Sequence, residues 1–267
     1  MPTKTAIAIA AHPDDIEFYM AGTLLLLKDA GYRTHYFCLT SGNCGTQDYS
    51  TAKIKAIRAS EARKASAVLG AQYHPPITDD LEIIYSVELL RRVAAVIREV
   101  RPTIVLTHSP QDYMEDHMNA SRLAVTAAFA RGLRNFRTSP RRDPADEEVT
   151  VYHAMPHGLC DGLRRRIIPG AFVDTTSVQE TKRQALAAHR SQQGWLAASQ
   201  GMSSYLRTME EMSLEVGRMS KKFAHAEGWR RRLHFGFGAP EADPLRDALG
   251  KRCRINKSYE LHLDRGA

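Results

Sequence analysis

The most constraining feature of this sequence is an alternation of short apolar runs and longer amphipathic segments over its first two-thirds. The apolar runs are typical of buried strands, and the segments between them have the length and the terminal glycines of helices. The expected strands are residues 6–11, 34–40, 103–107, 150–152 and 171–173, and the expected helices are residues 16–30, 53–69, 87–100 and 116–131. Strands that alternate with such helices predict a parallel sheet covered by helices on both faces.

The last third of the chain changes character. After residue 177 the pattern is helical, over 178–198 and again over 205–223, and the stretch beyond His225 reads as irregular. The predicted fold class is therefore α/β: a Rossmann-like, mostly parallel sheet with helices on both faces and a helical C-terminal extension. We expect one domain over residues 1–267, with the core in 1–176 and the helical elaboration in 177–267.

Composition narrows the class of protein. The chain has 267 residues, a net charge of +7 and 43% hydrophobic residues, as a globular domain does. The excess charge lies in short clusters such as 164–166 and 230–232, without an RNA-binding signature, so we interpret it as solvated surface and expect no nucleic-acid partner. No apolar run approaches the roughly 18–20 residues of a membrane span, and the cysteines form no CxxC pair, so a cytoplasmic location is expected.

Three polar segments follow the predicted strands, at residues 11–15, 40–45 and 108–117. In an open parallel sheet, ligands bind beyond the carboxyl ends of the strands. The first segment contains no glycine between Ala6 and Met20, which excludes the GxGxxG fingerprint of dinucleotide binding. Its two carboxylates, Asp14 and Asp15, would repel a diphosphate and attract a cation.

Two histidines and a carboxylate converge on this edge. His12 and Asp15 are three residues apart across a turn that contains Pro13, and His117 opens the helix after the third segment. This residue set is that of many catalytic zinc sites, which keep an open position for water. Zinc is favoured, but iron(II) or another divalent metal also suits this residue set, so the identity of the metal stays open. Capping of the following helix accounts for one of the paired aspartates, not for the whole set.

These residues resemble the LmbE-like, or PIG-L, family of zinc-dependent N-acetylglucosaminyl deacetylases. The matching motifs are AHPDD at 11–15, LTSGNCG at 39–45, RASE at 58–61, the DH end of HxDH at 116–117 and KRQALAAHRSQ at 182–192. The resemblance covers roughly residues 5–195. It implies that His12, Asp15 and His117 hold one Zn²⁺ per chain and that Asp14 is the general base. The implied reaction removes an N-acyl group, most often acetyl, from an amino sugar or its conjugate.

One position departs from the family pattern. The HxDH motif usually begins with a histidine that helps to stabilise the oxyanion or acts as an acid, and this chain has Met114 there. Methionine can do neither, so the role passes to Tyr113 or His157, to His108, or to the metal alone. We rank Tyr113 and His157 first.

The remaining expectations concern the substrate. Arg58 and Asn43 lie in matching motifs and are the expected substrate-binding residues. Tyr205 is interpreted as a packing residue. Whether Glu227 faces the pocket or the core stays open. The expected partner is a small N-acetylated amino-sugar substrate, and a homo-oligomer is expected by analogy. Two alternatives stay open: an amidase acting on a thiol conjugate or a natural-product acyl amide, and a non-catalytic Rossmann-like protein that binds a nucleotide or nucleic acid.

Overall fold

The computed structural model describes residues 4–193, 195 and 205–264. The strands are β1 (Thr5–Ala10), β2 (Arg33–Cys38), β3 (Gln72–His74), β4 (Ile104–Thr107), β5 (Thr150–Ala154), β6 (Ala171–Asp174), β7 (Ala226–Arg231) and β8 (Cys253–Ile255). The helices are α1 (Asp15–Tyr19), α2 (Ala21–Asp29), α3 (Thr51–Leu69), α4 (Val87–Val100), α5 (Glu115–Phe129), α6 (Gln179–Ala187), α8 (Tyr205–Ser220), α9 (Pro244–Leu249) and α10 (Lys257–Asp264).

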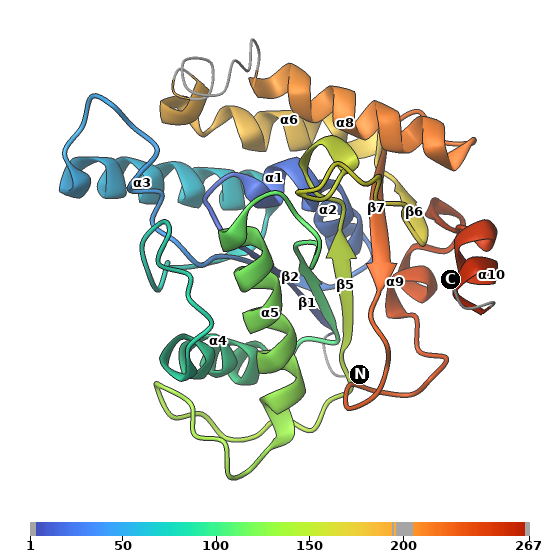
Figure 1. Ribbon diagram of the computed structural model, residues 1–267, viewed down its shortest axis with the longest axis horizontal. Helices are drawn as coiled ribbons and strands as arrows, with labels where there is room; N and C mark the ends of the chain where they lie inside the picture. Colours follow the sequence, from blue (N-terminus) through green and yellow to red (C-terminus); the bar gives the residue numbers. More distant parts are fainter. Residues whose placement is uncertain (1–3, 194, 196–204, 265–267) are drawn as a thin grey trace.

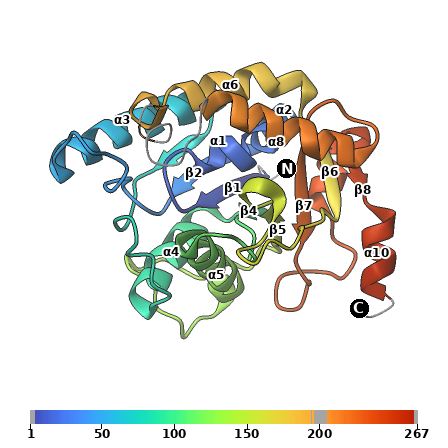
Figure 2. The same ribbon diagram turned by 45° about the horizontal axis from the view of Figure 1, so that its top comes forward.

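The described strands form one sheet in the order β3-β2-β1-β4-β5-β7-β6-β8. The pairs from β3 to β5 are parallel, and the pairs that involve β7 and β8 are antiparallel. Helices α4 and α5 cover one face, and α1, α2, α3, α6 and α8 lie on the other (Figure 1; Figure 2). The predicted α/β class with a mostly parallel sheet is confirmed.

Strand β1 explains why the sheet is buried on both faces. Ala6, Ala8 and Ala10 point into the core beneath α1 and α2, while Ile7 and Ile9 point into the core beneath α4 and α5. All six residues of β1 are buried, so the strand reads as a continuous apolar run instead of an alternating one. In register, Ile9 pairs with Phe37 of β2 and with Thr107 of β4, so these three strands end at one edge.

The predicted helix 16–30 is wrong in one respect, because it breaks at Met20 into α1 and α2. The break creates a new helix N-terminus inside the protein, where backbone N–H groups need acceptors. The buried carboxylate of Glu227 accepts from the N–H groups of Gly22 (2.8 Å) and Thr23 (2.7 Å) and from Lys182 Nζ (2.7 Å). Glu227 therefore belongs to the core and stabilises the start of α2.

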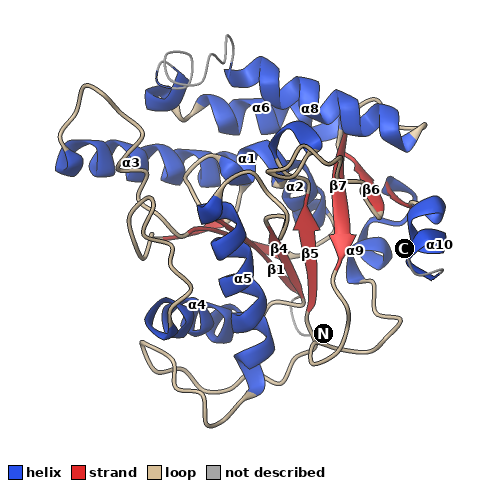
Figure 3. Cartoon of the chain, viewed as in Figure 1, coloured by secondary structure: helices blue, strands red, loops and turns tan. Residues whose placement is uncertain are grey.

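The expectation of an irregular tail beyond His225 is also wrong. Residues 226–231 form β7, which inserts between β5 and β6, and 253–255 form β8 (Figure 3). The sequence of β7, AEGWRR, has no apolar run. Its strand conformation depends on neighbours: a β-carbon at Gly228 would lie 2.7 Å from Met155, and Trp229 donates to the Thr23 hydroxyl.

In the helix predicted over 178–198, α6 ends at Ala187, and residues 194 and 196–198 lie outside the described residues.

Within the described ranges, no helix has the length and apolar character needed to cross a bilayer. Cys38, Cys44, Cys160 and Cys253 are all free thiols.

A histidine pair between β2 and β3 predicts acid destabilisation. His35 Nδ1 and His74 Nε2 lie 2.8 Å apart, and both side chains are buried. Burial and the facing His74 lower the pKa of His35 to about 4, and burial lowers the pKa of His74. Below pH about 6.5 the unfolded chain binds more protons than the folded one, so the free energy of unfolding should fall by about 1–2 kcal/mol as pH drops toward 4. Urea titrations at pH 7, 5.5 and 4.5 measure this.

The matched variant is His35→Gln, whose amide can still donate to His74. Its free energy of unfolding should change less between pH 6.5 and 4 than that of the wild type. An identical pH dependence in the two proteins would show that the pair is not responsible.

Candidate metal centre and active site

A pocket of about 260 Å³ lies at the carboxyl edge of β1, β2 and β4, where the sequence predicted ligand binding. The described residues that line it are His12, Asp14, Asp15, Phe18, Tyr19, Gly42, Cys44, Gly45, Arg58, Asp80, Leu81, Tyr113, Met114, His117, His157, Gln192 and Trp195. They come from six separate places in the first two-thirds of the chain, at 12–19, 42–45, 58, 80–81, 113–117 and 157, and from the segment after α6.

A tight turn delivers the first group of side chains. The N–H of Asp15 donates to the carbonyl of His12 at 3.2 Å, so His12–Asp15 forms a β-turn with Pro13 at its second position. Asp14, at the third position, has a backbone φ of 116°, a region that favours glycine. This strained conformation costs on the order of 1–3 kcal/mol and is typical of functional sites. The turn brings His12, Asp14 and Asp15 to one point.

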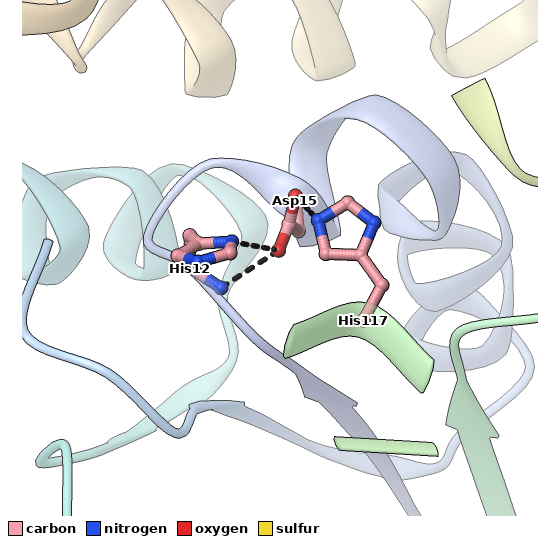
Figure 4. Close-up of side chains that lie close together, drawn as sticks. All are labelled: His12, Asp15 and His117. Atoms are coloured by element: carbon pink, nitrogen blue, oxygen red, sulfur yellow. Dashed lines mark hydrogen bonds and ion pairs between the residues drawn. The ribbon is translucent and has the colours of Figure 1, made fainter. Parts of the chain in front are cut away.

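The structure brings His12, Asp15 and His117 together. His12 Nδ1 lies 3.3 Å from Asp15 Oδ2, and His117 Nε2 lies 3.3 Å from Asp15 Oδ1 (Figure 4). One ligand atom from each residue lies within 4.8 Å of the other two, so the group can hold a metal ion. Asp15 is further held by the backbone N–H of His12, which donates to Oδ2 at 2.7 Å.

The outer ring nitrogens of both histidines face carboxylates. His12 Nε2 lies 3.1 Å from Asp116 Oδ2, and His117 Nδ1 lies 3.1 Å from Asp112 Oδ1. A proton on each outer nitrogen donates to its carboxylate and leaves the inner nitrogen free as a ligand. Asp112 was not among the residues that we predicted from the sequence. The signal available was its place in the acidic segment five residues before His117.

The electrostatics of the group favour positive charge. Burial opposes charge on both rings, yet Asp116 and Asp15 raise the pKa of His12 to about 10, and Asp15 and Asp112 raise the pKa of His117 to about 9. Although burial acts in the opposite direction, His117 and His108 hold the pKa of Asp15 well below its usual range. Carboxylates that stabilise protons here would equally stabilise a bound divalent cation, so the residues fit the predicted metal site.

Asp14 is held apart from this group. Its side chain makes no helix-capping hydrogen bond, which removes the capping interpretation. Instead, Tyr205 of α8 donates to Asp14 Oδ2 at 2.6 Å, and Arg58 Nη2 lies 3.4 Å from the same oxygen. Among the described residues, Oδ1 has no hydrogen-bond partner. Burial raises the pKa of Asp14. The packing interpretation of Tyr205, which is only 3% exposed, is therefore incomplete.

Tyr113 and His157 both line the pocket, and their ring centroids lie 6.0 Å apart. Burial raises the pKa of Tyr113 and lowers the pKa of His157, so both are neutral near pH 7. The Tyr19 hydroxyl lies 3.5 Å from His157 Nδ1, and a neutral His157 that accepts this hydroxyl at Nδ1 carries its ring proton on Nε2.

His108 occupies a different environment. Its ring stacks on His117 at 4.1 Å, its Nε2 accepts the N–H of Ala11, and it is only 1% exposed. It is not among the described pocket-lining residues. The ranking of Tyr113 and His157 above His108 stays a prediction.

Of the two expected substrate-binding residues, Arg58 is among the described pocket-lining residues and Asn43 is not. Arg58 lines the pocket, but it is buried and its guanidinium faces Asp14, Glu61 and the carbonyl of Pro13. The Asn43 side chain is not among the described lining residues, and its Oδ1 accepts the N–H of Asp80 at 2.8 Å. Asn43 thus ties two loops together, and its contact with substrate stays a prediction.

These features define a class of protein: an α/β domain with a His₂Asp group at the carboxyl edge of its parallel strands and a separate carboxylate beside it. The PIG-L family model, described as GlcNAc-PI de-N-acetylase, matches residues 7–128. Diacetylchitobiose deacetylase of Thermococcus kodakarensis is 32% identical over 237 residues, which is 85% of this chain and 82% of that protein. The chain belongs to the PIG-L (LmbE-like) family, as its motifs predicted.

One of the other similar proteins is named for a different activity. The 4-oxalmesaconate hydratase of Pseudomonas putida is 30% identical over 195 residues, which is 69% of this chain and 72% of that protein. Among solved structures, N,N'-diacetylchitobiose deacetylase of Pyrococcus horikoshii superposes with a TM-score of 0.74 at 24% identity, covering 91% of this chain and 89% of that chain. This likeness supports the fold.

Proposed function

We propose that this protein is a zinc-dependent hydrolase that removes the N-acetyl group of a small amino sugar or amino-sugar conjugate. The observation that carries the proposal is the position of Asp14: a carboxylate outside the His12–Asp15–His117 group, in the same pocket, with one oxygen anchored and the other without a hydrogen-bond partner in the part of the chain that the structure describes. The proposal includes one Zn²⁺ per chain and a cytoplasmic location.

The chemistry requires a nucleophile, an oxyanion donor and a proton for the amine. A divalent cation held by His12, Asp15 and His117 would supply Lewis acidity, which lowers the pKa of water and polarises the acyl carbonyl. Asp14 Oδ1 takes a proton from the attacking water while Oδ2 stays anchored to Tyr205. When the C–N bond breaks, Asp14 returns that proton to the leaving nitrogen. Water and amide are converted to acetate and a free amine.

Tyr113 and His157 are the candidate donors to the oxyanion. Both present a neutral O–H or N–H group in the pocket, and Met114 cannot donate. We assign the donor role lost at Met114 to one of these two residues.

The pocket suits a neutral sugar better than a polycarboxylate. Among the described lining residues, Arg58 is the sole arginine or lysine, and its guanidinium already faces Asp14 and Glu61. Apart from the metal group, the described lining residues offer no other cation to bind a substrate carboxylate. This argues against the reaction of the hydratase relative, whose name denotes a substrate with three carboxylates, and the deacetylase relatives support amide hydrolysis.

The test is acetate release from a panel of N-acetylated sugars, including N-acetylglucosamine and diacetylchitobiose, with purified protein of known metal content. We expect stoichiometric acetate and amine. The same protein is assayed for consumption of 4-oxalmesaconate. Hydration of that acid without hydrolysis of any N-acetyl sugar would overturn the proposal, as would activity that survives complete metal removal.

The Tyr205 hydroxyl provides the first mutational prediction. In Tyr205→Phe, Asp14 loses a charge-assisted hydrogen bond worth about 1.5–3 kcal/mol. We expect kcat to fall by about 10-fold to 100-fold with little change in KM, since Tyr205 holds Asp14 and is not itself a pocket-lining residue. Steady-state kinetics measure kcat and KM separately.

Tyr152→Phe is the matched control. Its hydroxyl is also buried and donates to an aspartate, Asp243, at 2.6 Å, but outside the pocket. It should lower stability as Tyr205→Phe does and leave kcat unchanged. Equal kcat values in both variants would exclude a positioning role for Tyr205.

The second mutational prediction concerns the donor to the oxyanion. Tyr113→Phe removes one hydroxyl and little volume, and His157→Gln keeps a donor while abolishing titration. Loss of an oxyanion donor typically costs about 10²–10³ in kcat. We expect at least one of these variants to fall by that order with its metal still bound, as measured by kinetics and metal analysis. Full activity in both would mean that the metal alone stabilises the oxyanion.

A further inference from the structure

One wall of the pocket is unusually apolar. Leu81, Tyr113 and Met114 lie along the N-terminal end of α5, and Leu81 and Tyr113 are 70% and 50% exposed. Leu81 is a large aliphatic side chain that the folded protein leaves in water at the mouth of its active site.

Leu81 is also held in place. Its backbone φ of 66° lies in the left-handed region, which is costly for a residue with a branched side chain. Its N–H donates to Asp116 Oδ2 at 2.8 Å, and the preceding Asp80 carboxylate accepts the N–H groups of Gly42 and Cys44, each at 2.9 Å. These hydrogen bonds hold the loop in a strained backbone conformation. The exposure of Leu81 is therefore a property of this held conformation and not of a loosely packed loop.

Met114 continues this wall toward the metal group. It is the N-cap of α5, lines the pocket and precedes His117 by three residues, so the two side chains start from the same first turn. Asp116 connects the two apolar residues: it lies two positions after Met114 and accepts the N–H of Leu81. Because Asp116 also contacts His12, this apolar wall begins beside the metal ligands.

We propose that Leu81 and Met114 form an acyl-chain subsite, so that the enzyme accepts N-acyl groups longer than acetyl. This rests on the proposed amide hydrolysis. The thioether of Met114 and the isobutyl group of Leu81 offer apolar contact beside the reacting acyl group. A chain of several carbons offers these two side chains more apolar surface to contact than an acetyl methyl does. Each fully buried methylene contributes about 0.8 kcal/mol, or roughly fourfold in affinity.

The experiment compares N-acetyl-, N-butyryl- and N-hexanoylglucosamine, with the released amine as the common readout. With partial burial of each methylene, we expect kcat/KM for the hexanoyl substrate to exceed that for the acetyl substrate about 10-fold. Leu81→Asn keeps a residue that tolerates the left-handed backbone, and Met114→Gln is close in size. Either change should reduce the hexanoyl-to-acetyl ratio to about 1–2.

Leu163→Asn is the control, because Leu163 is 73% exposed and is not among the described pocket-lining residues. It should keep the wild-type ratio. A wild-type ratio of 1 or less, or a high ratio that neither Leu81→Asn nor Met114→Gln alters, overturns the subsite while acetyl hydrolysis leaves the proposed function intact. If the wild type cleaves no N-acyl sugar, the proposed function itself fails. If one variant does not fold, the other still tests the subsite, and a wild-type ratio of 1 or less overturns it without any variant.

Discussion

Asp14→Asn is expected to lower kcat by about 10²–10⁴, the usual cost of removing a general base. Asparagine retains the shape of the side chain, can accept the hydrogen bond from Tyr205, and tolerates the positive φ of this position better than most residues. What it loses is the ability to take a proton from water. The fold and the bound metal should therefore be retained, and kinetics together with metal analysis of the same preparation check both.

The control for this variant is Asp29→Asn, which makes the same chemical change at an exposed position of α2. It should behave as the wild type. Near wild-type hydrolysis by Asp14→Asn would show that another group is the base. A loss of metal in Asp14→Asn would instead indicate that Asp14 is a ligand.

Asp15→Ala and His117→Ala are expected to lose metal and activity together. Each removes one of the three proposed ligands, and Asp15 also faces both histidines at 3.3 Å, so its removal withdraws negative charge that would stabilise a cation. We expect about one metal per chain in the wild type and a small fraction of that in each variant, measured by elemental analysis after exhaustive dialysis.

His262→Ala, at an exposed position of α10, is the matched histidine control and should keep full metal content. Full occupancy in both ligand variants would disprove the ligand assignment. Added Zn²⁺ that restores activity to His117→Ala but not to Asp15→Ala would still be consistent with it, because the remaining carboxylate retains the charge.

The sequence alone determined most of the parallel half of the sheet and the location of the pocket. Its apolar runs predicted β1, β2, β4 and β5, because strands buried on both faces are mostly apolar, while the short β3 at the edge was missed. Since parallel strands all end at one edge, the polar segments after β1 and β4 had to meet there. His12, Asp15 and His117 could therefore be predicted as neighbours without any distances.

The antiparallel half could not be read in the same way. Residues of β7 carry no apolar periodicity, and their strand conformation depends on pairing with β5 and β6 and on the close packing of Gly228. Strands of this kind are decided by their partners rather than by their own composition.

Only the tertiary structure decided how the groups of the candidate site are held. Asp112 and Asp116 orient the two histidines, and Tyr205 reaches Asp14 from a helix 191 positions away in sequence. A side chain's ability to donate a hydrogen bond is visible in the sequence, but its partner is not, because that depends on the packing of α8 against α1 and the sheet. The same holds for Leu81, whose exposure at the pocket follows from hydrogen bonds made by the backbone and not from its residue type. Residue chemistry and strand order thus predicted which groups meet at the site, and long-range packing decided which atom of each group is left free to react.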